Sequence, residues 1–349
     1  MNSNRVAIPT LVRIKTGALG RIGIYLSRQG HRRVAVFQSA GLLDDISGRL
    51  RFGMLSASIE PIVWVDVAAS QFEQAISYFT DLPRSVTAIV GLGGGKALDV
   101  AKYVAFLGKL PYFAAPTSLS NDGFASPQSS LTVCGKRRSL AAAMPFAVVV
   151  DTAVCLGAPK HLTLSGVGDL VAKFTAIEDW KLAFRHANEP IDDFAALLSD
   201  GSVHAFLARP ILDEEGIRLL ATSLLFNGIA MEVCNSSRPA SGSEHLISHA
   251  LDEISASPRL HGLQVGVATY LISLLQRHRS DVIATLFDKT SFWEAIKADP
   301  FSRAEWLEAV RRAPAIKEGF FTVLSTRDTL PEVEKALQTD KWLAPCFVD

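Results

Sequence analysis

Three histidines lie close together in the sequence, and their spacing could place them around one ligand. His245 and His249 are four residues apart, and His261 follows after a Ser-Ala-Ser-Pro break. Ser241, with Glu244 three residues later, forms a capping-box pattern, which predicts a helix with His245 at about its fourth residue. Residues four apart share a helix face and are separated by roughly 6 Å along the axis. His245 and His249 could therefore converge on one ion or ligand; the alternative is a pair of core or surface histidines with ordinary hydrogen bonds.

An aspartate could complete a metal site with these histidines. Asp169 follows Leu164-Ser-Gly-Val-Gly168 and is predicted to begin a helix over residues 169–180, where a simple helix cap is the alternative role. His261 is predicted to open a further helix that returns to the same pocket. Carboxylate oxygen and imidazole nitrogen ligands from separate helices suit zinc or iron(II) and leave a coordination position for substrate.

A run of glycines, Gly91-Leu-Gly-Gly-Gly95, lies between a predicted strand (residues 86–90) and a predicted helix. That order presents backbone N–H groups and a helix N-terminus to a phosphate. The run matches neither common phosphate-binding pattern. When G-x-G-x-x-G is read from Gly91, Lys96 replaces its last glycine, and when it is read from Gly93, Leu98 does. A P-loop would need Ser or Thr after Lys96, where this chain has Ala97. A tight turn explains two glycines but not four, since each extra glycine costs backbone entropy. The run therefore predicts a phosphate or pyrophosphate site at its end.

Short β-branched segments alternate with helical segments in the first half of the chain, which is typical of a parallel sheet covered by helices. The predicted strands cover residues 33–37, 62–65, 86–90, 112–115 and 146–150. Residues 116–127, rich in Ser, Asn, Asp, Gly and Pro, follow a strand at the edge where open parallel sheets bind ligands. From about Leu156 the pattern is helical. We expect an α/β Rossmann-like domain over residues 1–155 and an all-helical domain over residues 156–349.

The composition argues against nucleic acid and membrane partners. The 349-residue chain has 35 Lys plus Arg and 35 Asp plus Glu, so no polyanion-seeking surface is expected. The longest apolar run, residues 140–150, contains Pro145 and is too short to span a bilayer, and the N-terminus lacks a signal pattern. The 4 cysteines show no C-x-x-C spacing. We expect a cytoplasmic protein.

Several motifs between about residue 90 and residue 270 resemble, in order and spacing, those of the sn-glycerol-1-phosphate dehydrogenase family. They are G-G-G-K-A-L-D-V-A-K, P-T-S-L-S-N-D-G-F-A-S-P, S-G-V-G-D, K-F-T-A-I-E-D-W, S-G-S-E-H-L-I-S-H-A-L-D and L-H-G-L-Q-V-G. This family belongs to a superfamily with glycerol dehydrogenases, iron-containing alcohol dehydrogenases and 3-dehydroquinate synthases. The resemblance implies a dehydroquinate synthase-like fold and a homodimer or larger even assembly.

The same resemblance implies an NAD(P)-dependent, metal-assisted dehydrogenase of phospholipid metabolism. It would interconvert dihydroxyacetone phosphate and sn-glycerol 1-phosphate, or a closely related polyol or polyol phosphate. The metal would be zinc, with iron(II) or nickel(II) as alternatives. It would polarise a hydroxyl or carbonyl oxygen while the nicotinamide of NAD or NADP accepts or donates a hydride.

Site residues are carried over from the resemblance position by position. The glycine turn contributes Gly94, and the resemblance adds the other expected cofactor contacts: Gly95, Lys96, Ala97, Leu98, Asp99, Thr117, Ser118, Leu119, Ser120 and Ser126. The expected metal ligands are Asp169, His245 and His261, and Asp169 also approaches the substrate. Asp122 and His249 are expected substrate contacts, so His249 lies outside the metal ligand set. His249 would hydrogen-bond the substrate or relay its proton.

Two positions depart from the family pattern. Leu263 stands where Glu usually follows the third metal ligand, and Asn121 stands where His is usual. Both flank the expected substrate, so the molecule bound can differ from glycerol phosphate. A 3-dehydroquinate synthase-like sugar phosphate cyclase, which uses NAD transiently, is the alternative enzyme. A non-catalytic nucleotide-binding protein is a third possibility, against which the retained ligands argue. Gln38 and Ser39 follow the predicted strand of residues 33–37, and neither is acidic, so the sequence does not choose between NAD and NADP.

Overall fold

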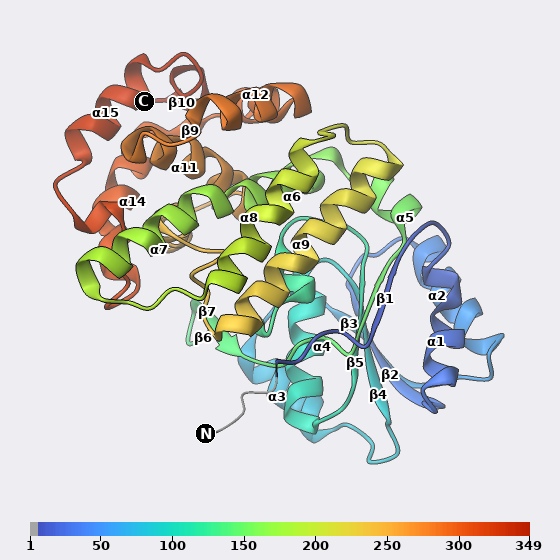
Figure 1. The fold of residues 1–349 in the computed structure, drawn as a ribbon. Helices are drawn as coiled ribbons and strands as arrows, with labels where there is room; N and C mark the ends of the chain where they lie inside the picture. The colour runs from blue at the N-terminus through green and yellow to red at the C-terminus, as the bar shows by residue number, and fades with distance from the viewer. Residues whose placement is uncertain (1–5) are drawn as a thin grey trace.

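The computed structural model describes residues 6–349, in which a parallel sheet with helices on both faces is followed by a helical part (Figure 1). The sheet order is β1-β8-β5-β4-β2-β3, and the neighbouring strands pair in parallel. Its strands are β1 (Leu11–Ile14), β2 (Arg33–Ser39), β3 (Glu60–Val67), β4 (Ala88–Gly93), β5 (Tyr112–Pro116) and β8 (Ala147–Val150). The helices among them are η1 (Leu19–Arg21), α1 (Ile22–Arg28), α2 (Asp44–Leu55), α3 (Phe72–Thr80) and α4 (Gly95–Gly108). The predicted α/β fold is confirmed, and β1 is an additional strand.

Side chains of the sheet alternate between two cores because successive residues of a strand point to opposite faces. Val34 and Val36 of β2 pack in one core with residues of η1, α1 and α2. Ala35 and Phe37 pack in the other core with residues of α3 and α4. Figure 1 shows these two helix layers on either side of the sheet.

The carboxyl ends of β2 and β4 form the switch point of the sheet, where open α/β sheets bind their ligands. Gly91 and Gly93 belong to β4 itself, so the turn is shorter than the sequence suggests. Gly93 has φ +129°, and a Cβ there would lie 2.2 Å from Ser39 Oγ. A Cβ on Gly91 would lie 2.7 Å from the Tyr112 hydroxyl. These two glycines are therefore required by packing. A Cβ on Gly94 or Gly95 would have no heavy atom within 4 Å, and these two leave open space at the switch point.

The loop after β5 contains a short helical turn and leads to a hairpin. The turn is η2 (Asp122–Ala125), and the antiparallel hairpin consists of β6 (Gln128–Val133) and β7 (Lys136–Ala141). The hairpin was not predicted, because β7 is largely exposed and lacks an alternating apolar pattern.

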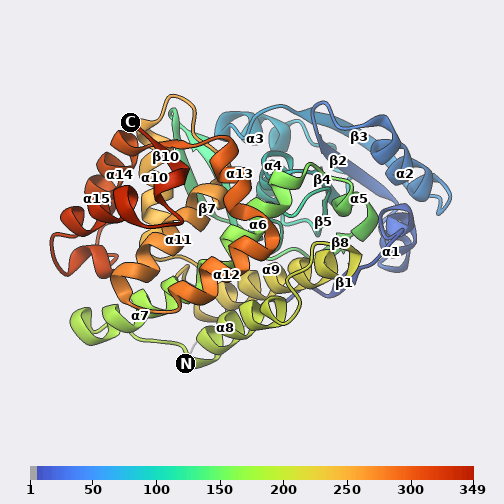
Figure 2. The same ribbon diagram turned by 90° about the horizontal axis from the view of Figure 1, so that it is seen from above.

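The helical part packs around a single large core that also takes in Leu98, Val148 and Val150 of the α/β part. Its helices are α5 (Thr152–Leu156), α6 (Lys160–Val171), α7 (Lys173–Ala187), α8 (Asp193–Leu207), α9 (Glu214–Cys234), α10 (Ser243–Ile254), α11 (His261–Gln276), α12 (Ser280–Thr290), α13 (Phe292–Ala298), α14 (Arg303–Ile316) and α15 (Leu330–Thr339). Short elements complete it: β9 (Phe301–Ser302), η3 (Val323–Ser325), η4 (Ala344–Cys346) and β10 (Phe347–Val348). Figure 2 shows this part beside the sheet.

Helix α9 is long and apolar enough to cross a membrane by length and composition, with 56% of its most apolar window buried. It lies among α5, α6 and α8. Packing inside the fold accounts for its apolar character.

The predicted start of a helix at Asp169 is wrong. Asp169 lies near the end of α6, and α7 begins at Lys173. The glycines before Asp169 suggested a break, but they are helical residues at close contacts. A Cβ on Gly166 would lie 1.9 Å from the Leu119 carbonyl oxygen, and one on Gly168 would lie 2.1 Å from the Gly262 carbonyl oxygen. Here glycine marks backbone contact between elements.

The predicted capping box at Ser241 is also wrong in part. Helix α10 begins at Ser243 with Gly242 as its N-cap, so His245 is its third residue. The Glu244 carboxylate does accept the Gly242 N–H, at 2.6 Å, but the Ser243 N–H is accepted by Asp179, at 2.7 Å. The predicted start of α11 at His261 is confirmed.

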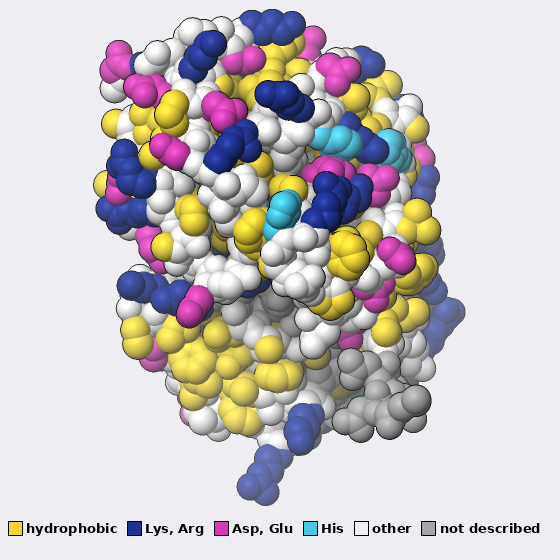
Figure 3. All heavy atoms as spheres, turned by 60° about the vertical axis from the view of Figure 1, so that its left-hand side comes forward, with side chains coloured by type: hydrophobic (Ala, Val, Ile, Leu, Met, Phe, Trp, Pro, Cys, Tyr) yellow, Lys and Arg dark blue, Asp and Glu magenta, His cyan; other side chains and the backbone are white. Residues whose placement is uncertain are grey.

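One face of the molecule shows acidic and basic side chains interspersed over its upper part (Figure 3). Hydrophobic side chains gather in the lower part of the same view. No field of a single charge sign covers this face, in line with the equal numbers of acidic and basic residues, 35 of each.

We predict that Gly168→Ala destabilises the protein by about 1–3 kcal/mol, the usual cost of overpacking, because the Gly262 backbone cannot recede easily. Urea unfolding measures the change. The control is Gly201→Ala in α8, where a Cβ meets nothing within 4 Å, and a gain of up to about 1 kcal/mol is expected from helix propensity. Equal unfolding midpoints for Gly168→Ala and the unsubstituted protein would contradict the close-contact role.

Candidate metal and cofactor site

Three potential metal ligands come together from three helices. Asp169 on α6, His245 on α10 and His261 on α11 place their donor atoms within 4.8 Å of one another. Asp169 Oδ1 lies 3.3 Å from His245 Nε2 and 4.0 Å from His261 Nε2. Ligand atoms that share one zinc ion, each at about 2.0–2.2 Å, are separated by roughly 3–4 Å. The donor set and its spacing therefore fit a divalent metal.

Hydrogen bonds hold both imidazoles with Nε2 toward Asp169. His245 Nδ1 lies 2.9 Å from Glu244 Oε1, and His261 Nδ1 lies 3.1 Å from Ser248 Oγ. Histidine ligands in metal sites commonly use their second nitrogen in this way, which fixes the tautomer and the ring orientation. This arrangement leaves the two Nε2 atoms for a metal.

The protonation states of Asp169 and His261 favour cation binding, whereas that of His245 opposes it. Burial opposes ionisation of Asp169, but the Lys173 charge and a hydrogen bond from His245 hold its pKa well below its usual value. Burial and the neighbouring His245 hold the pKa of His261 far below its usual value, so that ring is neutral. Burial lowers the pKa of His245, but hydrogen bonds to Asp169 and Glu244 raise it overall to about 8. A metal ion therefore has to displace a proton from His245 at neutral pH.

Lys173 is a site residue that the sequence reasoning missed. Its fully buried Nζ lies 3.2 Å from Asp122 Oδ2, 3.1 Å from the Ala240 carbonyl oxygen and 3.7 Å from Asp169 Oδ1. The Asp122 N–H also donates to Asp169 Oδ2, at 3.0 Å. The available signal was the spacing of Lys173 from Asp169, which is one helical turn. Lys173 and Asp169 together bring the expected substrate contact Asp122 to the metal ligands.

His249 lies beside the three donors but is not one of the group. Its ring stacks on that of His261, with 5.6 Å between centroids. Burial and the charge of His245 lower the pKa of His249 to about 3. The ring therefore stays neutral through the physiological range. This does not support the expected relay by a group titrating near neutral pH, and it leaves the hydrogen-bonding role.

The two departures from the family pattern have structural accounts. Asn121 caps η2, because its side-chain oxygen accepts the Gly123 N–H at 2.9 Å, and this turn presents Asp122. Leu263 packs against the helical core. The partner of His261 is Ser248, whose Oγ also accepts a hydrogen bond from Gln264 Nε2 at 3.0 Å. The orientation of His261 is thus maintained without an acidic side chain at position 263.

The expected cofactor contacts on α4 fall into two groups. Gly94, Gly95 and Lys96 border the open space at the switch point, and Lys96 is exposed. Ala97 and Leu98 are buried, so they could offer a cofactor only backbone atoms. Asp99 is also buried, and its Oδ1 lies 3.7 Å from Lys102 Nζ. Burial raises the pKa of Asp99 despite that positive charge.

The expected contacts between Thr117 and Ser126 form the loop beside this turn. The Thr117 N–H donates to the Gly93 carbonyl oxygen at 3.0 Å. Ser118 and Leu119 are buried. Ser126 is turned into the loop, where its Oγ donates to the Gly123 and Gln128 carbonyl oxygens at 3.3 and 3.2 Å.

A hydrogen-bonded chain links this loop to a metal ligand. The Ser165 hydroxyl donates to the Ser120 carbonyl oxygen at 2.8 Å and accepts the Gly262 N–H at 3.1 Å. Gly262 follows His261 directly. The expected cofactor loop and the expected metal ligands are therefore parts of one packed unit.

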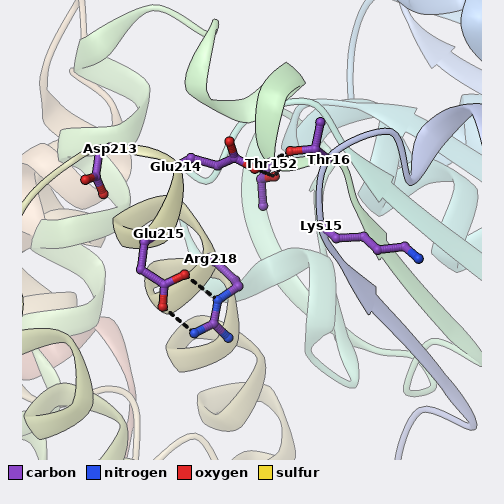
Figure 4. Close-up of a pocket in the computed structure, with 7 residues that line it drawn as sticks. All are labelled: Lys15, Thr16, Thr152, Asp213, Glu214, Glu215 and Arg218. Carbon is purple, nitrogen blue, oxygen red and sulfur yellow. Dashed lines mark hydrogen bonds and ion pairs between the residues drawn. The ribbon is translucent and has the colours of Figure 1, made fainter.

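A separate cavity of about 660 Å³ lies between the end of β1 and the first turns of α5 and α9 (Figure 4). Thr152 donates to Glu214 at 3.1 Å, and Thr16 also donates to Glu214. The other charged groups of this cavity include the Glu215–Arg218 ion pair, whereas Lys15 points away from them. The cavity contains none of the predicted site residues.

Comparisons with known proteins identify the family and the fold of the chain. Residues 13–159 match the family described as iron-containing alcohol dehydrogenase. A glycerol-1-phosphate dehydrogenase [NAD(P)+] of Methanosphaera stadtmanae is 31% identical over 97% of this chain and 99% of its own length. That of Thermofilum pendens is 34% identical over 90% of this chain and 92% of its own length. The crystal structure of glycerol dehydrogenase from Schizosaccharomyces pombe superposes with a TM-score of 0.76 at 16% identity, over 99% of this chain and 92% of that chain.

We predict that Glu244→Gln weakens metal binding by about 10- to 100-fold, because an amide holds the His245 ring less well than a carboxylate. Competition with a chelator measures the dissociation constant for zinc. Glu253→Gln on the exposed face of the same helix is the control and should bind zinc normally. An unchanged zinc affinity in folded Glu244→Gln would show that Glu244 does not orient a metal ligand.

Proposed function

The chain belongs to the glycerol-1-phosphate dehydrogenase family, and we propose that it is an NAD(P)-dependent, metal-assisted dehydrogenase that interconverts dihydroxyacetone phosphate and sn-glycerol 1-phosphate, or a closely related polyol phosphate pair. The observation that carries this proposal is the group formed by Asp169, His245 and His261. It is linked to the loop that borders the glycine turn of β4.

Each residue of the site has a proposed task. A metal held by Asp169, His245 and His261 would polarise the reacting oxygen of the substrate, while a nicotinamide exchanges a hydride with the adjacent carbon. The backbone N–H groups of Gly95 and Lys96 bind the cofactor phosphates at the start of α4. The Gly94 N–H donates to Ser39 Oγ, and Gly94 contributes the open space that the phosphates need. The loop from Thr117 to Ser120 borders the nicotinamide end of the cofactor.

Asp122 and His249 are the proposed substrate contacts. Lys173 holds the Asp122 carboxylate in place through their 3.2 Å contact. Burial and the charge of Asp169 raise the pKa of Asp122, and Lys173 opposes this shift. His249 presents a neutral imidazole, which can donate or accept one hydrogen bond to a substrate hydroxyl or phosphate. Both residues therefore orient the substrate beside the metal ligands.

Zinc is the proposed metal, because two imidazoles and one carboxylate are a frequent ligand set of catalytic zinc. Iron(II) and nickel(II) are the alternatives. Asn121 caps the turn that presents Asp122, and Leu263 packs against the helical core, so both departures from the family pattern have structural roles. The complete donor set also argues against a protein that has lost catalysis.

Further proposals concern organisation and cellular context. We divide the chain into a dinucleotide-binding domain of residues 1–155 and a metal- and substrate-binding domain of residues 156–349. A homodimer or larger even assembly and a cytoplasmic enzyme of phospholipid metabolism are proposed by analogy with the family. Neither nucleic acid nor a membrane is a proposed partner.

We predict that the zinc-loaded protein oxidises NADH or NADPH when dihydroxyacetone phosphate is added, with one equivalent of glycerol phosphate formed per cofactor oxidised. Cofactor absorbance and chiral analysis of the product measure this stoichiometry. Dihydroxyacetone without phosphate is the matched control substrate and should react more slowly. Conversion of a sugar phosphate without net cofactor turnover would instead support the cyclase.

The second prediction concerns His249. His249→Ala should retain zinc and bind NADH normally, since the ring is not one of the three donors. Its kcat/KM should fall roughly 10- to 100-fold, the effect of one lost hydrogen bond to substrate. His249→Gln, which keeps a side-chain donor and acceptor, should recover part of the loss. A loss of about 10³-fold or more that glutamine does not relieve would indicate a proton-transfer role. Loss of zinc would make His249 a ligand.

A further inference from the structure

We propose that the adenosine end of the cofactor site selects NAD over NADP, through the carboxylate of Asp66 held in place by Gln38. This inference rests on the proposed function, because it needs a dinucleotide at the switch point. It adds a preference between NAD and NADP, which is set by Gln38 on β2 and Asp66 on β3.

The order of the sheet fixes which end of the cofactor lies where. The cofactor phosphates belong at the glycine turn that follows β4. The reacting end must approach Asp122 and Asp169, which lie beyond the end of β5, on one side of β4. The strands on the other side of β4 are β2 and then β3. The adenosine therefore extends over the carboxyl ends of these two strands.

The end of β2 touches the glycine turn directly. The Gly94 N–H donates to Ser39 Oγ at 3.0 Å. Gln38 precedes Ser39, and Gln38 and Asp66 are register partners in β2 and β3. The ribose that follows the phosphates on this side is therefore placed beside Gln38 and Asp66. The sequence suggested no acidic group here, because the carboxylate comes from the neighbouring strand.

Two hydrogen bonds fix the Gln38 amide. Its Nε2 donates to Asp66 Oδ1 at 2.7 Å, and its Oε1 accepts the Ser47 hydroxyl at 2.9 Å. Asp66 is exposed at the strand end. A carboxylate in this position accepts hydrogen bonds from the ribose hydroxyls of NAD, whereas a 2′-phosphate requires a cationic partner. Asp66 thus favours the hydroxyl form and repels the phosphate form.

The charged residues of α2, the helix that contacts Gln38 through Ser47, are consistent with this selection. Asp44 and Asp45 occupy the first turn of α2, the helix that follows β2. Arg49 is paired with Asp45 at 2.7 Å. Arg51 lies over the Trp64 ring, 4.3 Å from its centroid. Both arginines of α2 thus contact other groups, and a 2′-phosphate would meet the carboxylate of Asp66.

The test is the affinity of the whole protein for NADH and NADPH, measured by calorimetry without substrate. We expect NADH to bind at least about tenfold more tightly. Asp66→Asn removes the charge, keeps the oxygen that Gln38 contacts, and should tighten NADPH binding by about tenfold or more. Glu60→Gln, at the exposed start of the same strand, is the control and should leave the ratio unchanged.

Adenosine 2′,5′-bisphosphate and adenosine 5′-monophosphate provide an independent probe, because they lack the nicotinamide. The monophosphate should compete with NADH better than the bisphosphate, and Asp66→Asn should reduce the difference. Equal affinities for NADH and NADPH, or a ratio unaffected by Asp66→Asn, would overturn the inference while leaving the proposed dehydrogenase intact. Failure of both dinucleotides to bind would overturn the proposed function and this inference together.

Discussion

Burying a carboxylate is costly unless its charge is compensated, and Asp169 is only 1% exposed. The Asp122 N–H and the Lys173 ammonium compensate it only partly, because the Asp122 and Glu244 carboxylates lie in the same network. Lys173 contacts both Asp122 and Asp169, but its one positive charge does not balance three carboxylates. A proton on His245 or a divalent cation must supply the rest of the positive charge. The buried carboxylates therefore require additional positive charge, which a metal ion bound by Asp169, His245 and His261 can supply.

The position of this carboxylate depends in turn on how closely helices approach one another. Gly168 brings α6 against the Gly262 carbonyl oxygen, directly after the ligand His261. Gly166 brings the same helix against the Leu119 carbonyl oxygen of the proposed cofactor loop. Side chains at these positions would separate the helices and move Asp169 away from His261. Backbone contact, and not side-chain interdigitation, therefore sets the distance between the donors.

The sequence predicted the parts of this site that depend on local pattern. Strand periodicity located the sheet, and the Ser-Pro break located His261 at the start of a helix. The prediction of a helix start at Asp169 was wrong, because a sequence does not distinguish glycines that end a helix from glycines that allow close packing, as Gly166 and Gly168 do. Lys173 and Ser248 were missed for another reason. Their roles depend on residues that the fold brings together, Asp122 for Lys173 and His261 for Ser248. The spacing of Lys173 from Asp169 pointed to one of its neighbours, but no spacing in the sequence indicates its contact with Asp122.

Hydride exchange requires a fixed distance between the cofactor half and the metal half of the proposed site. Besides the hydrogen-bonded chain through Ser165, the turn that carries Asp122 connects these two halves. On the cofactor side, buried Lys102 of α4 donates to the Gly123 and Gln128 carbonyl oxygens, both at 2.5 Å, so the loop that carries Asp122 is fixed to the helix beside the glycine turn. On the metal side, Asp169 accepts the Asp122 N–H. Under the proposed function, a cofactor held at α4 and a substrate held beside Asp169, His245 and His261 would both be positioned against the same short turn. Displacement of that turn would alter the distance between hydride donor and acceptor without removing any group that reacts, and catalysis is steeply sensitive to such misplacement.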